Sequence, residues 1–405
     1  MSRTEQTGFS PGGTAGKPTA SRQKVRKHRL RRFFRLRIVR AISALILIFL
    51  VWVAFSAGQA LTAPGGGSTS SKLAEWARDH YLGPVVTFGE WLTYNPPKVG
   101  GKPNFSLAVP KGQAVSGQPR KARARSFQPI IPARLQSLAG APLQGEGEWR
   151  VLEQVKGQPA VFGTFLRDAS YTSYVNGIVS MDQRLVKFQL HPGFEDPGPG
   201  NWGPNGQPWI PPGDRSGLVA TFNGGFKLDT AEGGFYLNGR TKGTLTNGTA
   251  SVVYYKNGTI KIGIWGRDVR MTPQVVGVRQ NLKLMIDHGK IAPDINQNVI
   301  SNWGATLGGG YYVWRSGLGI TADGRVIFVY GPALNAQDLA ELLRRAGTVE
   351  AMQLDINPFW MSYEFYTQDR HPSDPTPHAL LPTQQQTAYR YYSEYSRDFT
   401  AVYGR

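Results

Sequence analysis

One segment constrains the fold of this chain more than any other. From Ala41 to Ala57 the sequence runs for seventeen residues without a charged side chain. That length lies at the lower end of the roughly 17–25 residues that a membrane-spanning helix needs, and Ile38 and Val39 extend the apolar run. Inside a bilayer the backbone must satisfy its own hydrogen bonds, which a helix does within a single segment. We therefore predict a transmembrane anchor over residues 41–58.

The charges beside this segment predict its orientation. Ten lysine and arginine residues lie between Arg22 and Arg40, and a flank of this kind stays in the cytoplasm. The expectation is a basic cytoplasmic tail over residues 1–40, a single pass through the plasma membrane, and an extracytoplasmic C-terminal domain. A cleaved signal peptide is the alternative. It is less favoured because its apolar region usually has about 7–15 residues and ends in an A-x-A cleavage site, which is not clearly present here.

The net charge of +19 is concentrated in two parts of the chain. Residues 1–40 carry +11 and residues 98–126 carry +7, so the remaining residues carry only +1. A nucleic-acid-binding domain would have its basic residues on the folded body, and we therefore expect no nucleic-acid partner. The absence of cysteine excludes thiol catalysis, disulfides and cysteine-ligated zinc.

Composition divides the rest of the chain. We predict a flexible tether over residues 59–72 and a short helical or docking segment over 73–94. A basic Pro/Gly-rich linker is expected over 95–141, and a strand-rich domain over 142–405. The basic stretch from Lys98 to Arg125 either contacts anionic envelope polymer or lipid or only adds solubility.

Two dipeptides in the domain predict β-hairpins. Asn257-Gly258 separates two runs rich in β-branched and aromatic residues, and Asp323-Gly324 does the same in "GLGITADGRVIFVY". Such dipeptides are the strongest short-range hairpin signal. A sheet-rich domain follows.

One helix is expected within this domain, in "LNAQDLAELLRRAG". Asn335 and Asp338 have the spacing of a helix N-cap and its N3 partner, and Gly347 stands where a C-terminal glycine belongs. Together with strands at 326–330 and 351–355, this helix forms a βαβ unit whose two strands run parallel. Asp355 then lies at the carboxyl end of a strand, where ligands of such sheets tend to bind. The predicted fold class is α+β, a mixed β-sheet domain with flanking helices.

Polar residues at the ends of three predicted strands are the candidates for chemistry. Asn223 begins an Asn-Gly-Gly turn, which is either a plain turn or a place where the backbone approaches a ligand closely. Arg315 follows an aromatic run, and the alternative is that it is an ordinary cation on an edge strand. Asp355 and Asn357 share a strand face, with a turn-capping Asp as the structural alternative. The six histidines show no metal-ligand spacing, so no transition metal is expected. The sequence also contains no phosphate-binding P-loop motif, and we expect no cofactor.

The order of "FNGGF", an Arg-Ser-Gly-x-Gly segment entering an Asp-Gly-Arg hairpin, and "LAELLRRAG…AMQLD" resembles the phosphodiester glycosidase family. The similarity covers about residues 217–358. "GEGEW" at 145–149 is also similar to a feature of long actinobacterial members.

The resemblance implies a glycosidase with Asp355, Arg315 and Asn223 as catalytic residues. A guanidinium suits the anionic leaving group of a sugar 1-phosphodiester, and a carboxylate suits an oxocarbenium-like transition state. Gly224, Gly225, Asn357, Trp360 and Glu232 are the expected substrate-binding residues, with Asp229 as a further loop carboxylate.

One departure from the family pattern affects the expected function. Family members follow the strand-end Asp with a Gly-rich, Ser-containing turn, whereas this chain has "DINPFWMSY". Pro358, Phe359 and Trp360 close the site, remodel it for a larger glycan, or mark a member that binds without cleaving. The sequence therefore predicts a membrane-anchored extracytoplasmic glycosidase acting on a sugar phosphodiester or related cell-envelope glycan. The alternative is a non-catalytic glycan-binding or scaffolding protein with the same fold.

Overall fold

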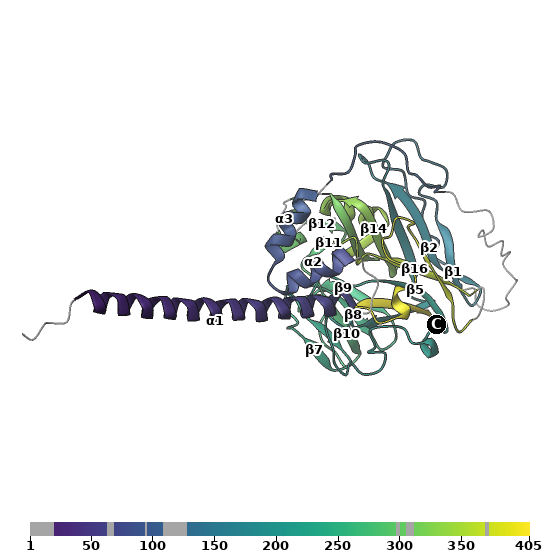
Figure 1. Cartoon of the computed structure of the whole chain (residues 1–405). Helices are drawn as coiled ribbons and strands as arrows, with labels where there is room; N and C mark the ends of the chain where they lie inside the picture. Colours follow the sequence, from purple (N-terminus) through teal and green to yellow (C-terminus); the bar gives the residue numbers. More distant parts are fainter. Residues whose placement is uncertain are drawn as a thin grey trace, which may run out of the picture. The chain divides into compact units, whose positions relative to one another are not determined.

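The structure is a computed structural model that describes residues 20–62, 69–93, 95–107, 128–296, 300–304, 312–368 and 372–405. The chain divides into two compact units, residues 1–62 and residues 63–405 (Figure 1). Most of the predicted basic stretch falls in residues 108–127, outside the described part of the chain.

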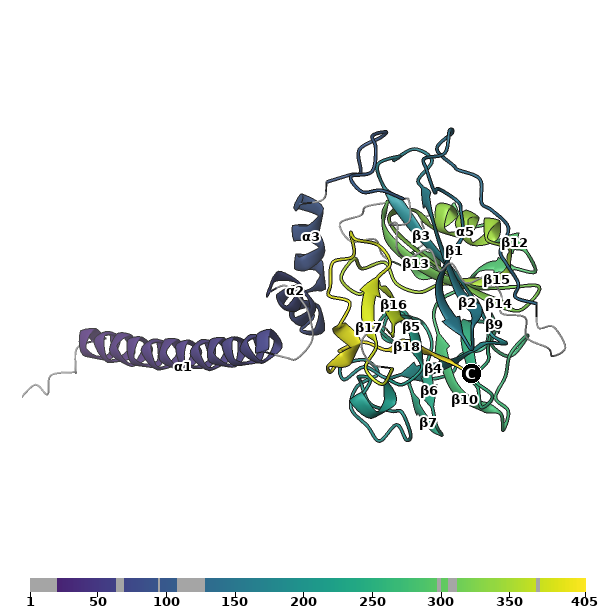
Figure 2. The same ribbon diagram turned by 90° about the vertical axis from the view of Figure 1, so that its right-hand side faces the viewer.

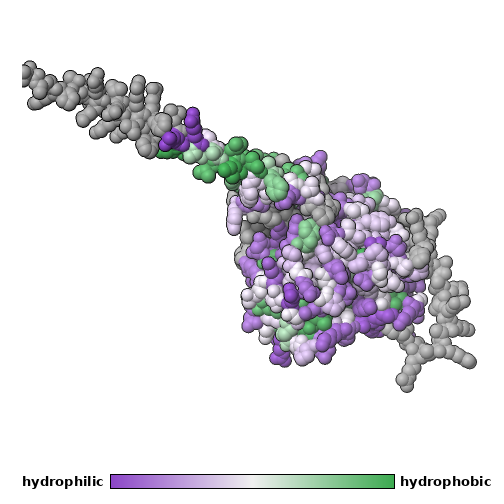
Figure 3. Space-filling view, turned by 60° about the horizontal axis from the view of Figure 1, so that its bottom comes forward, coloured by the Kyte–Doolittle hydropathy of each residue, from purple (hydrophilic) through white to green (hydrophobic). Residues whose placement is uncertain are grey.

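The first unit contains one long helix, α1 (Ala20–Thr62). Its stretch from Arg37 to Thr62 has a mean hydropathy of 2.6 over its most apolar window, with none of that window buried. Figure 3 shows hydrophilic side chains at the start of this part of the helix and an apolar surface beyond them. The helix is thus long and apolar enough to cross a membrane. A signal sequence near the N-terminus would have the same length and composition. Its orientation stays a prediction.

The second unit contains three sheets in which every pair of neighbouring strands runs antiparallel. The eight-stranded sheet has, in spatial order, β1 (Arg150–Val155), β2 (Gln158–Arg167), β3 (Val175–Asp182), β14 (Arg325–Leu334), β13 (Val313–Thr321), β15 (Thr348–Gln353), β11 (Leu284–Asp287) and β12 (Lys290–Ile291). The second sheet has β7 (Arg240–Lys242), β6 (Phe235–Leu237), β10 (Val275–Gln280), β8 (Ala250–Tyr255) and β9 (Ile260–Ile264). The third has β17 (Thr376–Ala379), β16 (Tyr363–Thr367), β5 (Leu218–Asn223), β18 (Phe399–Gly404) and β4 (Val186–His191).

The described helices of this unit are short: α2 (Thr69–Asp79), α3 (Gly83–Thr93), α4 (Ile300–Trp303) and α5 (Ala336–Arg345). The predicted α+β class is confirmed by this set of sheets with few helices.

Both predicted hairpins form. Strands β8 and β9 pair across Asn257-Gly258, and β13 and β14 pair across Asp323-Gly324. The two glycines have φ angles of 79° and 84°, in the left-handed region that glycine adopts without strain.

Helix α5 begins and ends as its sequence predicts. The Asn335 side chain accepts a hydrogen bond from the backbone N–H of Asp338, and the Asp338 carboxylate accepts one from the N–H of Asn335. Gly347 follows the helix with a φ of 92°. The apolar face of α5, with Leu339 and Leu343 fully buried, covers the eight-stranded sheet near β13, β14 and β15 (Figure 2).

The βαβ unit is present in a modified form. Strands β14 and β15, joined by α5, both pair antiparallel with β13 and are therefore parallel to each other, as expected. They are not neighbours, because β13 lies between them. The reason is the Asp323-Gly324 hairpin, which places β13 against β14 before the helix returns the chain to the other edge of β13.

The folded domain begins earlier in the sequence than residue 142. Leu107 and Leu135 are buried in its two largest hydrophobic clusters. A Cβ on Gly147 would lie 1.9 Å from the carbonyl oxygen of Leu135, so only glycine permits this contact. The Glu146 carboxylate, fully buried, accepts hydrogen bonds from the backbone and guanidinium of Arg167 on β2. The "GEGEW" segment therefore fastens the chain before β1 to the sheet.

Candidate active site

Three strand ends meet at one serine. The Nδ2 of Asn223, the last residue of β5, donates to the Oγ of Ser316 on β13 over 3.0 Å. The same Oγ accepts the backbone N–H of Asp355 over 3.1 Å, and the N–H of Ser316 donates to the Asp355 carbonyl over 2.9 Å. The serine thus connects the third sheet to the eight-stranded sheet and holds the chain just beyond β15. Asn223 and Asp355, predicted as neighbours, share this partner.

Asn223 has hydrogen bonds at both ends of its side-chain amide. Besides Ser316, its Nδ2 donates to the Gly224 carbonyl over 2.8 Å, and its Oδ1 accepts the N–H of Ser362 over 3.2 Å. With only 3% of its surface exposed, the amide acts as a fixed connector between strands rather than as a surface group.

Asp355 is 4% exposed, and its two carboxylate oxygens have different surroundings. Oδ1 accepts the backbone N–H groups of Ile356 and Asn357 over 2.7 and 2.9 Å. Oδ2 lies 4.0 Å from Nη2 of Arg397. Burial raises the pKa of Asp355 to about 6, opposed by the Arg397 charge and by the two N–H donors. Because donors and a guanidinium face the carboxylate, the surroundings do not suit a hard cation.

The two glycines of the Asn-Gly-Gly motif allow close packing. A Cβ on Gly224 would lie 2.1 Å from Oδ2 of Asp398, and one on Gly225 would lie 2.9 Å from Oδ1 of Asn281. Neither glycine has a left-handed backbone. The two glycines are therefore required by the side chains that approach them, and the role of the turn toward a ligand stays a prediction.

The group that approaches Gly224 belongs to a buried ion pair. Asp398 accepts hydrogen bonds from Nε and Nη2 of Arg279 over 2.9 and 3.1 Å, and both side chains are at most 2% exposed. Arg279 also donates to the carbonyls of Phe226 and Gln280. Burial raises the pKa of Asp398, and the Arg279 charge opposes this shift. The pair fixes the backbone that follows Asn223.

The turn that departs from the family pattern is partly buried. Pro358, Phe359 and Trp360 are half-buried. The Asn357 side chain caps the turn by accepting the N–H of Phe359, and the Asn357 carbonyl accepts the N–H of Trp360, both over 3.0 Å. The structure thus gives Asn357 a structural role in shaping the turn.

Trp360 lies beside the cation that faces Asp355. The guanidinium of Arg397 is 5.5 Å from the centroid of the Trp360 ring, within the range of a cation–π contact, and Nη2 of Arg397 is 3.5 Å from the Gly225 carbonyl. The ring of Tyr395 packs edge-to-face against that of Trp360, with the two ring centroids 5.8 Å apart. Arg397, Asp355 and the Asn-Gly-Gly turn therefore form one polar cluster bounded by aromatic rings.

Arg315 has a different environment. Its guanidinium donates to the Leu334 carbonyl over 3.0 Å, to Gln353 Oε1 over 2.7 Å and to the Trp303 carbonyl over 3.3 Å. Successive residues of a strand point to opposite faces, so Arg315 lies on the face opposite Ser316. No contact between Arg315 and Asp355 occurs among the described residues. Its hydrogen bonds attach α4 to the sheet, and its catalytic role stays a prediction.

The two loop carboxylates, Glu232 and Asp229, are exposed in the turns after β5. In the described part of the chain neither contacts Asp355. The second buried carboxylate near the site is Asp398, which the sequence analysis overlooked together with Arg397, Arg279 and Ser316. The only sequence signal for Asp398 and Arg397 is a charged pair directly before an apolar strand, which usually marks a solvated turn.

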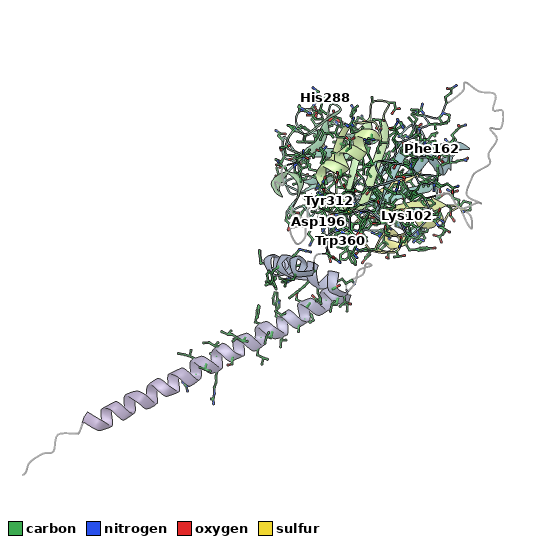
Figure 4. The ribbon with its side chains drawn as sticks, turned by 90° about the horizontal axis from the view of Figure 1, so that it is seen from above. Lys102, Phe162, Asp196, His288, Tyr312 and Trp360 are labelled. Carbon is green, nitrogen blue, oxygen red and sulfur yellow. The ribbon has the colours of Figure 1, made fainter. Side chains whose placement is uncertain are left out.

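One group of described residues could hold a metal ion: Asp287, His288 and Glu350, with ligand atoms within 4.8 Å of one another. Arg267 already donates to both carboxylate oxygens of Asp287. Figure 4 shows His288 at the edge of the domain opposite Trp360 and Asp196. This group is thus separate from the Asp355 cluster.

The part of the chain that matches a known family contains the Asn-Gly-Gly turn and ends at Asp355. Residues 216–355 match the phosphodiester glycosidase family. The resemblance inferred from the motifs is confirmed over this segment.

Comparisons with whole proteins give weaker similarities. The zebrafish N-acetylglucosamine-1-phosphodiester alpha-N-acetylglucosaminidase catalytic domain, auto-inhibited by its pro-peptide, is 16% identical with a TM-score of 0.40, covering 64% of this chain and 88% of that one. A hypothetical protein from Synechocystis is 8% identical with a TM-score of 0.36, covering 62% and 64%. No curated protein sequence matches the chain significantly.

Proposed function

We propose that this protein is a membrane-anchored, extracytoplasmic glycosidase that hydrolyses a sugar 1-phosphodiester or a related glycan of the cell envelope. One observation carries the proposal. The family match ends on Asp355 and includes Asn223, and the buried hydrogen bonds of Ser316 join these two residues. The apolar helix α1 and its basic flank support the location.

The reaction breaks the bond between the anomeric carbon of the sugar and the bridging phosphate oxygen. The phosphate monoester leaves with the bonding electron pair, and water supplies the hydroxyl group that the sugar gains. Because the leaving group is already an anion, it needs less protonation than the alcohol released from an ordinary glycoside. A positive charge beside the departing phosphate then lowers the barrier.

Arg397 is the cation assigned to the leaving group. Its Nη2 lies 4.0 Å from Oδ2 of Asp355, and a planar guanidinium can bind two phosphate oxygens at once. In its ionised form, Asp355 stabilises the positive charge that develops at the anomeric carbon, or accepts the proton of the attacking water. Asn223 positions Ser316 and the Asp355 backbone, and Trp360 offers a ring on which a sugar can stack.

Hydrolysis by the purified full chain in detergent tests the proposal. The substrates are an N-acetylglucosamine 1-phosphodiester and envelope polymers linked by sugar phosphodiesters, and the released sugar is measured. Asp355→Asn and Arg397→Gln should abolish most of the activity. Arg315→Lys, which keeps the charge on the opposite face of the sheet, is the matched control. Inactive wild-type protein, or unchanged activity in Asp355→Asn, refutes the catalytic assignment.

A glycan-binding protein without activity is the second candidate. The low exposure of Asp355 favours it, because a buried carboxylate is less accessible to a substrate, and the turn at Pro358–Trp360 departs from the family pattern. This candidate requires saturable glycan binding with no turnover, and binding that survives Asp355→Asn but weakens in Trp360→Ala. Calorimetry on the same purified proteins separates the two candidates.

A further inference from the structure

Helix α3 carries a row of exposed apolar side chains that the domain does not cover. Val85, Phe88 and Leu92 are 66%, 60% and 62% exposed. Their spacing of three and four residues places them on one face of the helix. Tyr81 and Leu82, directly before the helix, are 95% and 43% exposed. Five large apolar side chains are therefore exposed within twelve residues.

The rest of the described domain does not resemble this segment. Across the described residues from 95 to 405, only Val99, Ile131, Met271 and Tyr389 are large apolar side chains with comparable exposure, and they are not close together in the sequence. Soluble proteins tolerate such residues singly, whereas a contiguous row indicates a surface that contacts something apolar.

The two short helices form a fixed corner. The N–H of Leu82 donates to the Ala77 carbonyl over 2.8 Å, and the N–H groups of Val85 and Val86 donate to the Leu82 carbonyl. The rings of Trp76 and His80 stack 4.7 Å apart at the end of α2. Because the corner is held by these contacts, α3 presents its apolar row in a defined direction relative to α2.

The covalent connection to α1 limits where this row can lie. Only residues 63–68 separate α1 from α2, and a fully extended connection of that length spans at most about 25 Å. If α1 spans the bilayer, α2 begins within that distance of the membrane surface. Amphipathic helices lie in such an interface with their apolar face inserted to about 5–10 Å, and exposed tyrosine is typical of the same depth.

We propose that α3 lies in the membrane–water interface on the outer face of the plasma membrane, with Val85, Phe88 and Leu92 among the lipid acyl chains. The proposal rests on the membrane anchoring within the proposed function and not on catalysis. It gives the segment between the anchor and the domain a lipid-binding role. The domain would then be attached to the membrane at two points, the anchor and α3, rather than by a free tether.

Site-specific labelling tests this directly, because the chain contains no cysteine. An environment-sensitive fluorophore is attached to single-cysteine variants of the full chain in phosphatidylcholine–phosphatidylglycerol vesicles. The variants are Val85→Cys, Phe88→Cys and Leu92→Cys. Lipids with a doxyl group on the acyl chain serve as quenchers. Lys261→Cys, on an exposed position of β9, is the control in water, and Leu47→Cys is the control in the anchor.

We expect the doxyl lipids to quench the label at 85, 88 and 92 several times more strongly than at 261, with a blue-shifted emission. Accessibility to aqueous iodide at all three positions overturns the proposal. A blue shift without doxyl quenching also overturns it and points instead to a second copy or another protein on this face. Quenching at 47 reports the anchor separately, and hydrolysis by the same variants reports the active site.

Discussion

Replacing Gly224 with alanine tests the packing on which the candidate site depends. The added Cβ would lie 2.1 Å from Oδ2 of Asp398 and 2.6 Å from its carbonyl oxygen. Neither atom can move freely, because the carboxylate is held by Arg279 and the carbonyl accepts the N–H of Gly224 over 3.0 Å. The methyl group must therefore displace either the buried ion pair or the backbone before β18.

The structure gives the size of the effect. Forcing extra atoms into a packed core costs about 1–3 kcal/mol, and disrupting a buried ion pair costs about 3–5 kcal/mol. We expect Gly224→Ala to lower the free energy of unfolding by roughly 3 kcal/mol or more. For a domain of this size, 1 kcal/mol corresponds to about 2–4 °C, so the Tm should fall by roughly 6–12 °C.

Thermal unfolding of the full chain in detergent, followed by near-ultraviolet circular dichroism, measures this change. Gly213→Ala is the matched control, because a Cβ there meets nothing within 4 Å and the backbone is not left-handed. That substitution should leave the Tm unchanged or slightly higher. Gly225→Ala should have an intermediate effect, since its nearest contact is the side-chain oxygen of Asn281 at 2.9 Å. Equal Tm values for Gly224→Ala and Gly213→Ala would refute the close-packing argument.

Three further predictions concern charged groups. Burial raises the pKa of Asp355 to about 6, and the ionised form is proposed to act. The value of kcat/KM should therefore rise with pH up to about 6 and then level off. A pH–rate profile that falls over this range contradicts the assignment. Arg397→Gln should lower kcat/KM by roughly 10²–10³, the loss expected for one transition-state donor. Arg315→Lys should mainly lower the Tm. The reverse pattern would indicate that Arg315 is the catalytic cation. Burial raises the pKa of Glu364 from 4.5 to about 7, although Arg390 opposes the shift. The folded state thus holds a proton that the unfolded chain has released. The free energy of unfolding should therefore fall by roughly 3 kcal/mol between pH 4.5 and 7, and denaturant titrations of Glu364→Gln should show a smaller fall.

Local signals in the sequence were sufficient for the elements that they specify. The Asn257-Gly258 and Asp323-Gly324 turns and the capping box at Asn335 depend on interactions within a few residues, and each formed as expected. The arrangement of the sheets was less accessible. That β13 separates β14 from β15 depends on pairing between distant segments. The Asp323-Gly324 hairpin places β13 against β14, but no local motif indicates that β15 pairs with the other edge of β13.

The candidate site also contains residues that local sequence signals indicate and residues that only the folded structure reveals. Asn223 and Asp355 could be selected from the sequence because Asn223 ends an apolar strand and Asp355 lies two residues beyond one. Asp398 and Arg279 are 119 residues apart and meet only through the third and second sheets. Nothing near either residue in the sequence distinguishes it from a surface charge. The need for two consecutive glycines becomes clear only when this pair is seen against Gly224.

The two arginines, Arg315 and Arg397, have different surroundings. Arg315 and Ser316 are adjacent, so the alternation of the strand sends one side chain to the α5 face and the other to the Asp355 face. A motif containing both residues does not indicate which of them lies beside Asp355, whereas the hydrogen bond from the Asp355 backbone N–H to the Ser316 Oγ shows that Ser316 does. The proposed mechanism therefore takes its positive charge from another element. Arg397 supplies it from the segment before β18, where it also contacts the ring of Trp360. A substrate that stacks on Trp360 would therefore meet the guanidinium and the carboxylate together, which connects the unusual turn after Asp355 with the proposed choice of an anionic glycan.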